Sequence, residues 1–180
     1  AAMVSVSISN CQHLIVDGLA SDQTTAQADN WQVFGANDLI VRNCTFEGGQ
    51  RGINFNTALT TALVEKSTFK NISLLTTSDA LEFLQASYNG VTIQDNTFLN
   101  NKRHIRLHEQ TGNVIENFTI RRNFLNGTAG EEGLRLIGAS NVVIENNVVM
   151  KSGQQGIYID AGCSNLTVTH NTFYKTGFET

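Results

Sequence analysis

The segment VTIQDNTF (91–98) is one copy of a phrase that recurs through most of the chain. In each copy two apolar residues alternate with polar ones, and a small or amide residue then precedes another strand-like position. The other copies are LIVRNCTF (39–46), ALVEKSTF (62–69), FTIRRNFL (118–125), VVIENNVV (142–149) and LTVTHNTF (166–173). Self-similarity of this kind indicates a repeat architecture.

The small or amide position gives the period of the repeat. Its occupants are spaced by 23 to 29 residues, and they are Cys44, Ser67, Asn96, Asn123, Asn147 and Asn171. A second apolar phrase precedes the first one in most repeats, as GINF (52–55), ALEF (80–83), HIRL (104–107), GLRL (133–136) and GIYI (156–159). Each repeat therefore holds about three short strands, and no stretch has helical periodicity.

These repeats predict an all-β fold, a right-handed single-stranded parallel β-helix (a β-solenoid) of about seven coils with three short strands each. Successive coils would stack at the strand spacing of about 4.8 Å. Apolar residues would stack inside, and the turn asparagines would form a ladder that bonds buried backbone groups. We expect one domain over residues 1–180, either whole or as a segment of a longer chain. The end coils lack a capping helix, so further chain or partner subunits are expected to cover them.

The N-x-F and G-I-x-I phrases resemble those of the pectate-lyase-like superfamily of right-handed parallel β-helices, and they extend over essentially the whole chain. This resemblance implies a secreted or cell-surface protein, although the first ten residues contain no recognisable signal peptide. Lyases, hydrolases, epimerases, tailspikes and adhesins share the scaffold, so the function has to be argued from the site.

Composition narrows the partners. The net charge is −4 and the sequence pI is about 5.5, so nucleic acid, which usually requires a basic surface, is not an expected partner. No apolar run approaches the length needed to span a membrane.

Two insertions interrupt the regular coils, at residues 70–79 (KNISLLTTSD) and 108–117 (HEQTGNVIEN). One precedes the strand ALEF and the other follows HIRL on the next coil, so both border the same patch. Charged outward residues gather at this patch, and His104 stands where most other coils have glycine or alanine. The predicted centre consists of Asp79, Glu82, Arg103, His104, Arg106, His108, Glu132 and Arg135, with Tyr158 as a stacking platform. The same pattern is also typical of a solvated sheet face on which opposite charges pair across strands.

A cluster of arginine, histidine and carboxylates suits an acidic polysaccharide, because arginine binds a uronate carboxylate with two hydrogen bonds. We therefore expect Arg103, Arg135, Glu132 and Tyr158 to bind the substrate. β-Elimination from a uronate needs a group that neutralises the carboxylate, a base near the C5 proton and an acid at the leaving oxygen. His108, His104 and Arg106 are the candidates for this chemistry.

A narrower resemblance covers the stretch from Glu82 through NTFLNN (96–101), RHIRLHEQTGN (103–113) and EEGLRLIGASNVVIENN (131–147). It is similar to the alginate lyase and chondroitinase B family of β-helix lyases. The resemblance implies that Glu82 binds Ca²⁺, for which Asp79 offers a second carboxylate, and it aligns Arg135 with an arginine of that family. The positions of the second calcium-binding glutamate, the base lysine and the acid arginine hold Ala80, Ser87 and His108.

Two functions follow as alternatives. The first is a carbohydrate-active enzyme, a polysaccharide lyase that cleaves an acidic, uronate-containing polysaccharide by β-elimination. The second is a non-catalytic structural or glycan-binding β-solenoid, such as a segment of a tailspike, an adhesin or a filament.

Overall fold

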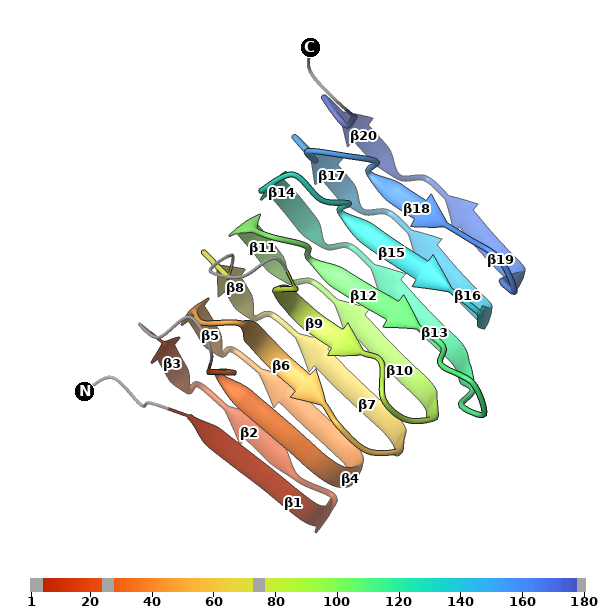
Figure 1. The fold of residues 1–180 in the computed structure, drawn as a ribbon. Helices are drawn as coiled ribbons and strands as arrows, with labels where there is room; N and C mark the ends of the chain where they lie inside the picture. Colours follow the sequence, from red (N-terminus) through yellow and green to blue (C-terminus); the bar gives the residue numbers. More distant parts are fainter. Residues whose placement is uncertain (1–4, 24–27, 73–76, 178–180) are drawn as a thin grey trace.

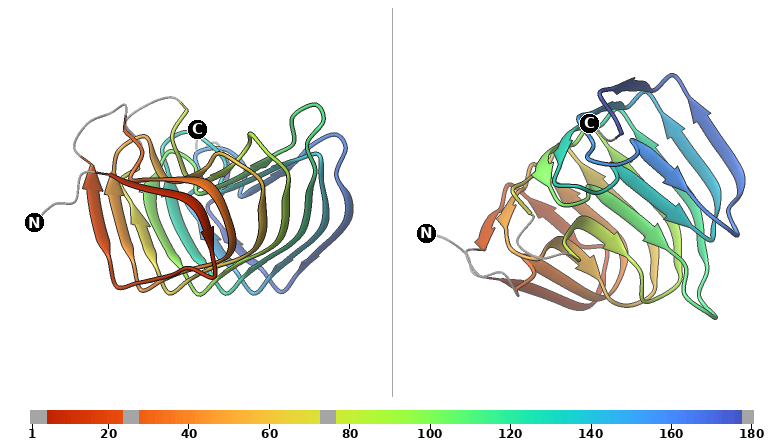
Figure 2. Two further views of the ribbon diagram at one scale, coloured as in Figure 1. Left: turned by 90° about the horizontal axis from the view of Figure 1, so that it is seen from below. Right: turned by 45° about the horizontal axis from the view of Figure 1, so that its top comes forward.

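The structure is a computed structural model that describes residues 5–23, 28–72 and 77–177. Over these residues the chain forms twenty β-strands and no helix, which confirms the all-β prediction. The strands form a parallel stack of coils with three faces (Figures 1 and 2).

Each face takes one strand from each coil. Face A contains β1 (Val6–Gln12), the first part of β4 (Trp31–Arg42), β6 (Arg51–Phe55), β9 (Asp79–Phe83), β12 (Ile105–His108), β15 (Leu134–Ile137) and β18 (Ile157–Ile159). Face B contains β2 (Ile15–Asp17), the second part of β4, β7 (Leu59–Glu65), β10 (Tyr88–Gln94), β13 (Ile115–Arg121), β16 (Ala139–Glu145) and β19 (Ser164–Thr169). Face C contains β3 (Ala20–Gln23), β5 (Thr45–Gly48), β8 (Thr68–Lys70), β11 (Thr97–Asn101), β14 (Phe124–Thr128), β17 (Val148–Met150) and β20 (Thr172–Tyr174).

Faces A and B join into one sheet because the long strand β4 pairs with β6 at one end and with β7 at the other. Face C is a separate sheet, and its seven strands in the described part of the chain agree with the predicted number of coils. In Figure 1 the strands of face A lie in front, and the coils advance from the N-terminal to the C-terminal end.

The core lies between the three faces, where the same inward position recurs in every coil. On face C the rings of Phe46, Phe69 and Phe98 stack at centroid distances of 4.6 and 4.9 Å. On face A the rings of Phe55 and Phe83 stack at 4.4 Å. Stacked aromatic side chains bury a large apolar area, so the period-two pattern of the sequence becomes a continuous core.

The predicted asparagine ladder occupies the corner between faces B and C. The backbone N–H of Asn96 donates to Oδ1 of Asn123 at 3.0 Å, and Asn123 makes the same bond to Asn147. The Nδ2 atom of Asn96 donates to the carbonyl oxygen of Val64 on the preceding coil at 2.8 Å. One amide side chain thus satisfies backbone donors and acceptors that the turn would otherwise leave buried and unpaired.

The two predicted insertions border face A. The connection from β12 to β13 projects beyond the neighbouring turns (Figure 1). The insertion predicted at residues 70–79 lies between β8 and β9, and its residues 73–76 lie outside the described residues.

Candidate functional site

The predicted charged column lies on face A, in the register that the sequence indicates. The side chains of Asn54, Glu82, Arg106, Arg135 and Tyr158 occupy paired positions on five successive strands, from β6 to β18. Parallel pairing without a slip gives adjacent coils equivalent positions, so charged groups can contact one another along the stack.

Arg103 is the centre of the largest ion-pair group. Its guanidinium donates to Asp79 at 2.7 Å, to Glu132 at 2.8 Å and to Glu131 at 2.8 Å. Burial alone would lower the pKa of Arg103, but the charges and hydrogen bonds of Asp79 and Glu132 outweigh it and raise the pKa. Burial likewise opposes ionisation of Glu132, but the hydrogen bond from Arg103, a backbone hydrogen bond and the charges of Arg103 and Arg135 together outweigh it and lower the pKa of Glu132. Arg103 and Glu132 are thus mutually neutralised inside the site.

A second group surrounds the carboxylates of strand β9. Arg51 Nε lies 2.8 Å from Glu82, and Arg106 Nη1 lies 3.6 Å from both Asp79 and Glu82. The side chains of Asp79 and Glu82 have no exposed area. Burial, followed by the hydrogen bond and the charge of Asp79, raises the pKa of Glu82 to about 7 against the opposing effect of Arg51. The Glu82 carboxyl is therefore easily protonated near neutral pH.

His104 does not face the outer surface. It lies fully buried at the corner of faces C and A, where its Nδ1 atom pairs with Asn101 Nδ2 at 3.1 Å and its ring lies 5.7 Å from that of Phe98. Burial lowers the pKa of His104 to about 3, so the ring is neutral at physiological pH. The expected placement of His104 among outward groups was wrong, because its column points toward the core. An imidazole without exposed area cannot contact a ligand outside the coil.

His108 lies at the rim of the site, at the end of β12. Arg106 Nη2 lies 2.8 Å from His108 Nδ1. A guanidinium can only donate, so Nδ1 accepts and the proton of the neutral ring is assigned to Nε2. Burial and the charges of the neighbouring arginines lower the pKa of His108, which favours this neutral form.

Arg135 and Tyr158 form the most accessible part of the site. The guanidinium carbon of Arg135 lies 5.4 Å from the centre of the Tyr158 ring, within the range of a cation–π contact. The Tyr158 hydroxyl donates to Asp160 at 2.9 Å, which raises the pKa of Tyr158. The ring is thereby held in one orientation beside the guanidinium.

The charges of face A lie in two layers. Carboxylates form the inner layer: Asp29, Asp79, Glu82 and Glu132 are buried. Guanidinium groups lie above them, and the exposed fraction of the side chain is 17% for Arg106 and 27% for Arg135. The charged groups that a ligand can reach are therefore more cationic than the cluster as a whole.

The donor set of Asp79 and Glu82 does not fit Ca²⁺ in this arrangement. Calcium takes six to eight oxygen ligands, whereas these carboxylates are contacted by the guanidinium groups of Arg51, Arg103 and Arg106. Over the described ranges, no three acidic, histidine or cysteine side chains are grouped so that they could hold a metal ion. Calcium binding stays a prediction.

Sequence reasoning left three members of the cluster out of the predicted site, namely Asp29, Arg51 and Glu131. Asp29 accepts hydrogen bonds from Gln32, Arg51 and Asn54 and extends the network by one coil. It belongs to the same outward column as Arg51 and Asp79, and this position in the column could have predicted that Asp29 belongs to the cluster. Glu131 contacts Arg103 from the turn before β15, and no periodic pattern marks that position.

Comparison with known proteins agrees with this fold. The family model described as a right-handed β-helix region matches residues 32–179. The crystal structure of PfbA, a surface adhesin of Streptococcus pneumoniae, superposes with a TM-score of 0.65 and 16% sequence identity over 97% of this chain. The match covers 58% of the PfbA chain, so the present chain spans little more than half of that structure. The search of curated proteins gave no match.

The parallel coils, the asparagine ladder and the family match agree, and in the described residues no helix is long and apolar enough to cross a membrane. The chain belongs to the right-handed β-helix family.

Proposed function

We propose that the chain is a glycan-binding β-helix module that binds an acidic polysaccharide on face A, at a cell surface or outside the cell. Arg106 and Arg135 would pair with carboxylate or sulfate groups of the polymer, and Tyr158 would stack against a sugar ring. The polymer would cross several coils, because the contacting residues come from β12, β15 and β18.

The observation that carries this proposal is the two-layer arrangement of charge. Buried carboxylates hold the arginines in place, and the outer edges of the guanidinium groups remain accessible. Such fixed donors bind an anion without first having to become ordered, which lowers the entropic cost of binding. The fold likeness to a surface adhesin is compatible with this reading and does not extend to a ligand.

Affinity electrophoresis tests the proposal with alginate, polygalacturonate, chondroitin sulfate and dermatan sulfate in the gel, with and without Ca²⁺. We expect at least one of these polymers to retard the wild-type protein, and less so at high salt, because exposed charge pairs are screened. The change Arg135→Gln should weaken binding about tenfold, the ratio expected for about 1.4 kcal/mol of lost interaction.

The matched control is Arg122→Gln. Arg122 is also a partly exposed, ion-paired arginine, but it contacts Asp95 at the corner of faces B and C. We expect this variant to bind like the wild type. Absence of binding to all four polymers, or an equal loss in Arg122→Gln, would contradict the proposal.

Lyase activity on the same polymer is the second candidate. The observation in its favour is that the arginines contact one oxygen of Asp79 and both oxygens of Glu82 as ion pairs without hydrogen-bond geometry, so these buried carboxylates are incompletely bonded. Against it, His108 and Tyr158, which reach the surface of the site, are poor bases. His108 Nδ1 is engaged by Arg106, and the pKa of Tyr158 is raised. Elimination leaves an unsaturated sugar that absorbs ultraviolet light, so its appearance with a bound polymer would favour the enzyme.

A further inference from the structure

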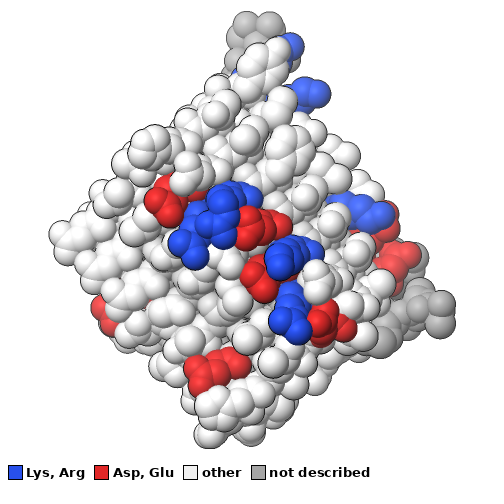
Figure 3. Space-filling view, turned by 180° about the vertical axis from the view of Figure 1, so that it is seen from behind, with Lys and Arg blue, Asp and Glu red and all other residues white. Residues whose placement is uncertain are grey.

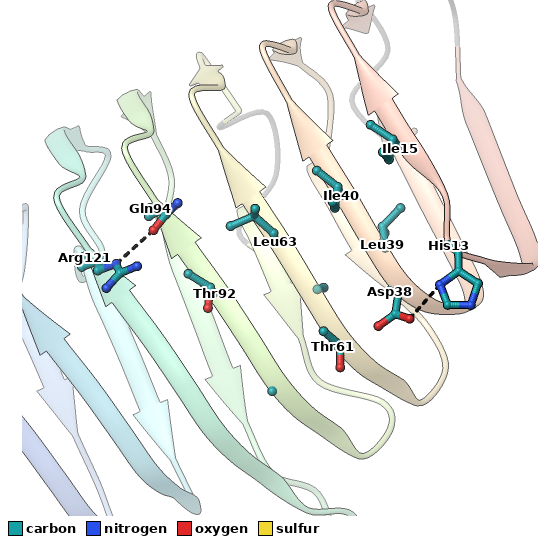
Figure 4. A pocket seen from close by; sticks show the side chains of 12 residues that line it. His13, Ile15, Asp38, Leu39, Ile40, Thr61, Leu63, Thr92, Gln94 and Arg121 are labelled. Atoms are coloured by element: carbon teal, nitrogen blue, oxygen red, sulfur yellow. Dashed lines mark hydrogen bonds and ion pairs between the residues drawn. The ribbon is translucent and has the colours of Figure 1, made fainter.

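An open groove with a volume of about 650 Å³ lies on the outer surface of face B (Figure 4). Its lining comes from five successive coils, from β2 and the turn before it to β13. The groove therefore runs along the stacking direction of the coils and across the strands. None of the arginines of face A contributes to it.

The floor of the groove is an aliphatic column. Ile15, Ile40 and Leu63 occupy paired outward positions on β2, β4 and β7, and Thr92 of β10 continues the column. The exposed fraction of Ile15 is 55%, although a polar residue could occupy each outward position of a sheet face that meets solvent. A row of aliphatic side chains in register, exposed at Ile15 and half-buried at Ile40 and Leu63, is thus a feature that needs a reason.

One wall of the groove follows a repeated backbone conformation. Asp38, Thr61 and Gly90 all have φ between 53° and 71°, and strand pairing skips these positions. The wall begins with a contact at 2.9 Å between His13 Nδ1 and Asp38 Oδ2 (Figure 4). Left-handed residues within a strand bend it, and the same bend continues at Asn117, Asn141 and Asn165 on the later coils.

The opposite wall is polar and is fixed by its own hydrogen bonds. Arg121 Nε donates to Gln94 Oε1 at 2.9 Å, and Gln94 Nε2 donates to Glu65 at 2.9 Å. This wall belongs to a band in which acidic and basic side chains alternate along the coils (Figure 3), with Asp17–Arg42 as a further pair at 2.8 Å. The charges beside the groove are therefore paired with one another.

We propose that this groove binds an uncharged linear polysaccharide lengthwise along the coils. The C–H faces of the sugar rings would rest on Ile15, Ile40 and Leu63, and ring hydroxyls would bond to the side chains of Gln94, Arg121 and Thr61. The floor repeats at the strand spacing of about 4.8 Å, which is comparable to the length of one sugar unit. Successive sugars would then meet equivalent positions.

The surroundings of the groove favour a neutral polysaccharide over an anionic polymer, a peptide strand or a protein partner. An anionic polymer would have to compete with Glu145 for Arg121, whereas a neutral polymer needs no free charge. A peptide that adds to a sheet requires a free strand edge, but the floor strands β4, β7 and β10 are paired on both sides. Three aliphatic side chains are also far fewer than the twenty or more residues that a stable protein interface uses on each side.

Affinity electrophoresis in gels that contain galactomannan, mixed-linkage glucan or hydroxyethyl cellulose tests this second site. We expect one of these neutral polymers to retard the wild-type protein. Leu63→Glu should reduce the affinity at least about tenfold, because a charge replaces the apolar floor. Leu63 points outward, so circular dichroism should show an unchanged fold.

The matched control is Val143→Glu, which places the same charge in the same outward column two coils beyond Thr92. We expect this variant to bind the neutral polymer like the wild type. Arg135→Gln on face A should also leave this binding unchanged, so failure of either site can be recognised separately. The proposal is overturned if no neutral polymer binds, if Leu63→Glu binds normally, or if Val143→Glu loses as much affinity.

Discussion

At the scale of single residues, His104 shows how position within a coil decides the state of a titratable group. Its column holds Gly52, Ala80 and Gly133 on other coils, and a Cβ added at Gly52 would lie 2.8 Å from the Phe69 ring. A side chain at this position therefore points at the core, where the imidazole is fully buried. In the sequence, the glycine and alanine of this column indicate that the position faces the core. The same small residues are also typical of positions where two backbone segments come close together.

This burial predicts a specific pH dependence for His104. The pKa of about 3 in the folded protein lies below the usual 6.5, so the unfolded chain takes up a proton first as the pH falls. Stability is therefore lost as the pH decreases from 6.5 toward 3. Between about pH 7.5 and about pH 5 the loss amounts to about 2 kcal/mol, and a variant that cannot titrate, His104→Gln, should lack it.

Urea unfolding of both proteins at the two pH values measures this difference. Comparison with His104→Gln removes contributions that both proteins share, including that of Glu82, whose raised pKa acts in the opposite direction. In NMR spectra the ring signals of His104 should stay at their neutral positions down to about pH 4. An unfolding free-energy difference that does not change with pH would contradict the assignment.

At the scale of strands, the pattern of the sequence predicts the register of face A but not its burial. Alternation in HIRL correctly places Ile105 and Leu107 inside and aligns Arg106 with Glu82 and Arg135. It does not indicate that Asp79 and Glu82 are covered, because covering depends on guanidinium groups from neighbouring coils. Period-two alternation assigns a side chain to a face, whereas ion-pair networks depend on contacts between distant residues.

The network around Arg103 gives a prediction at this scale. Replacement by methionine, in Arg103→Met, keeps much of the side-chain volume but leaves Asp79 and Glu132 buried without their main partner. Breaking a buried ion pair in this way costs about 3–5 kcal/mol. The matched change Arg122→Met removes an exposed partner of Asp95 and should cost less than about 1 kcal/mol. Equal unfolding free energies in urea for the two variants would show that the network is not structural.

At the scale of the whole molecule, the stack is a series of nearly equivalent coils. The ladder residues Asn96, Asn123 and Asn147 make the same bonds to their neighbours, although the coils differ in length because of the loops between strands. The fold could be predicted because one phrase recurs at each coil. The groove on face B could not, because period-two alternation marks Ile40 and Leu63 as outward residues but does not report the shape of the surface that they form.

Equivalence of the coils predicts that one coil can be removed. Deleting residues 123–146 joins Arg122 to Asn147, so that Asn147 takes the ladder position of Asn123 and β17, β18 and β19 stack on β11, β12 and β13. Each coil contacts only its neighbours, and stability is therefore a sum of coil and interface terms. The shortened chain should keep the far-ultraviolet circular dichroism of a β-sheet and unfold cooperatively at a lower temperature.

Deleting only residues 135–146 breaks the register of every later strand, and this control should not fold into the stack. The shortened chain also lacks Arg135, so it should lose binding to acidic polysaccharide on face A while its groove on face B remains. Loss of both kinds of binding in a protein that still folds would show that the two faces do not act independently.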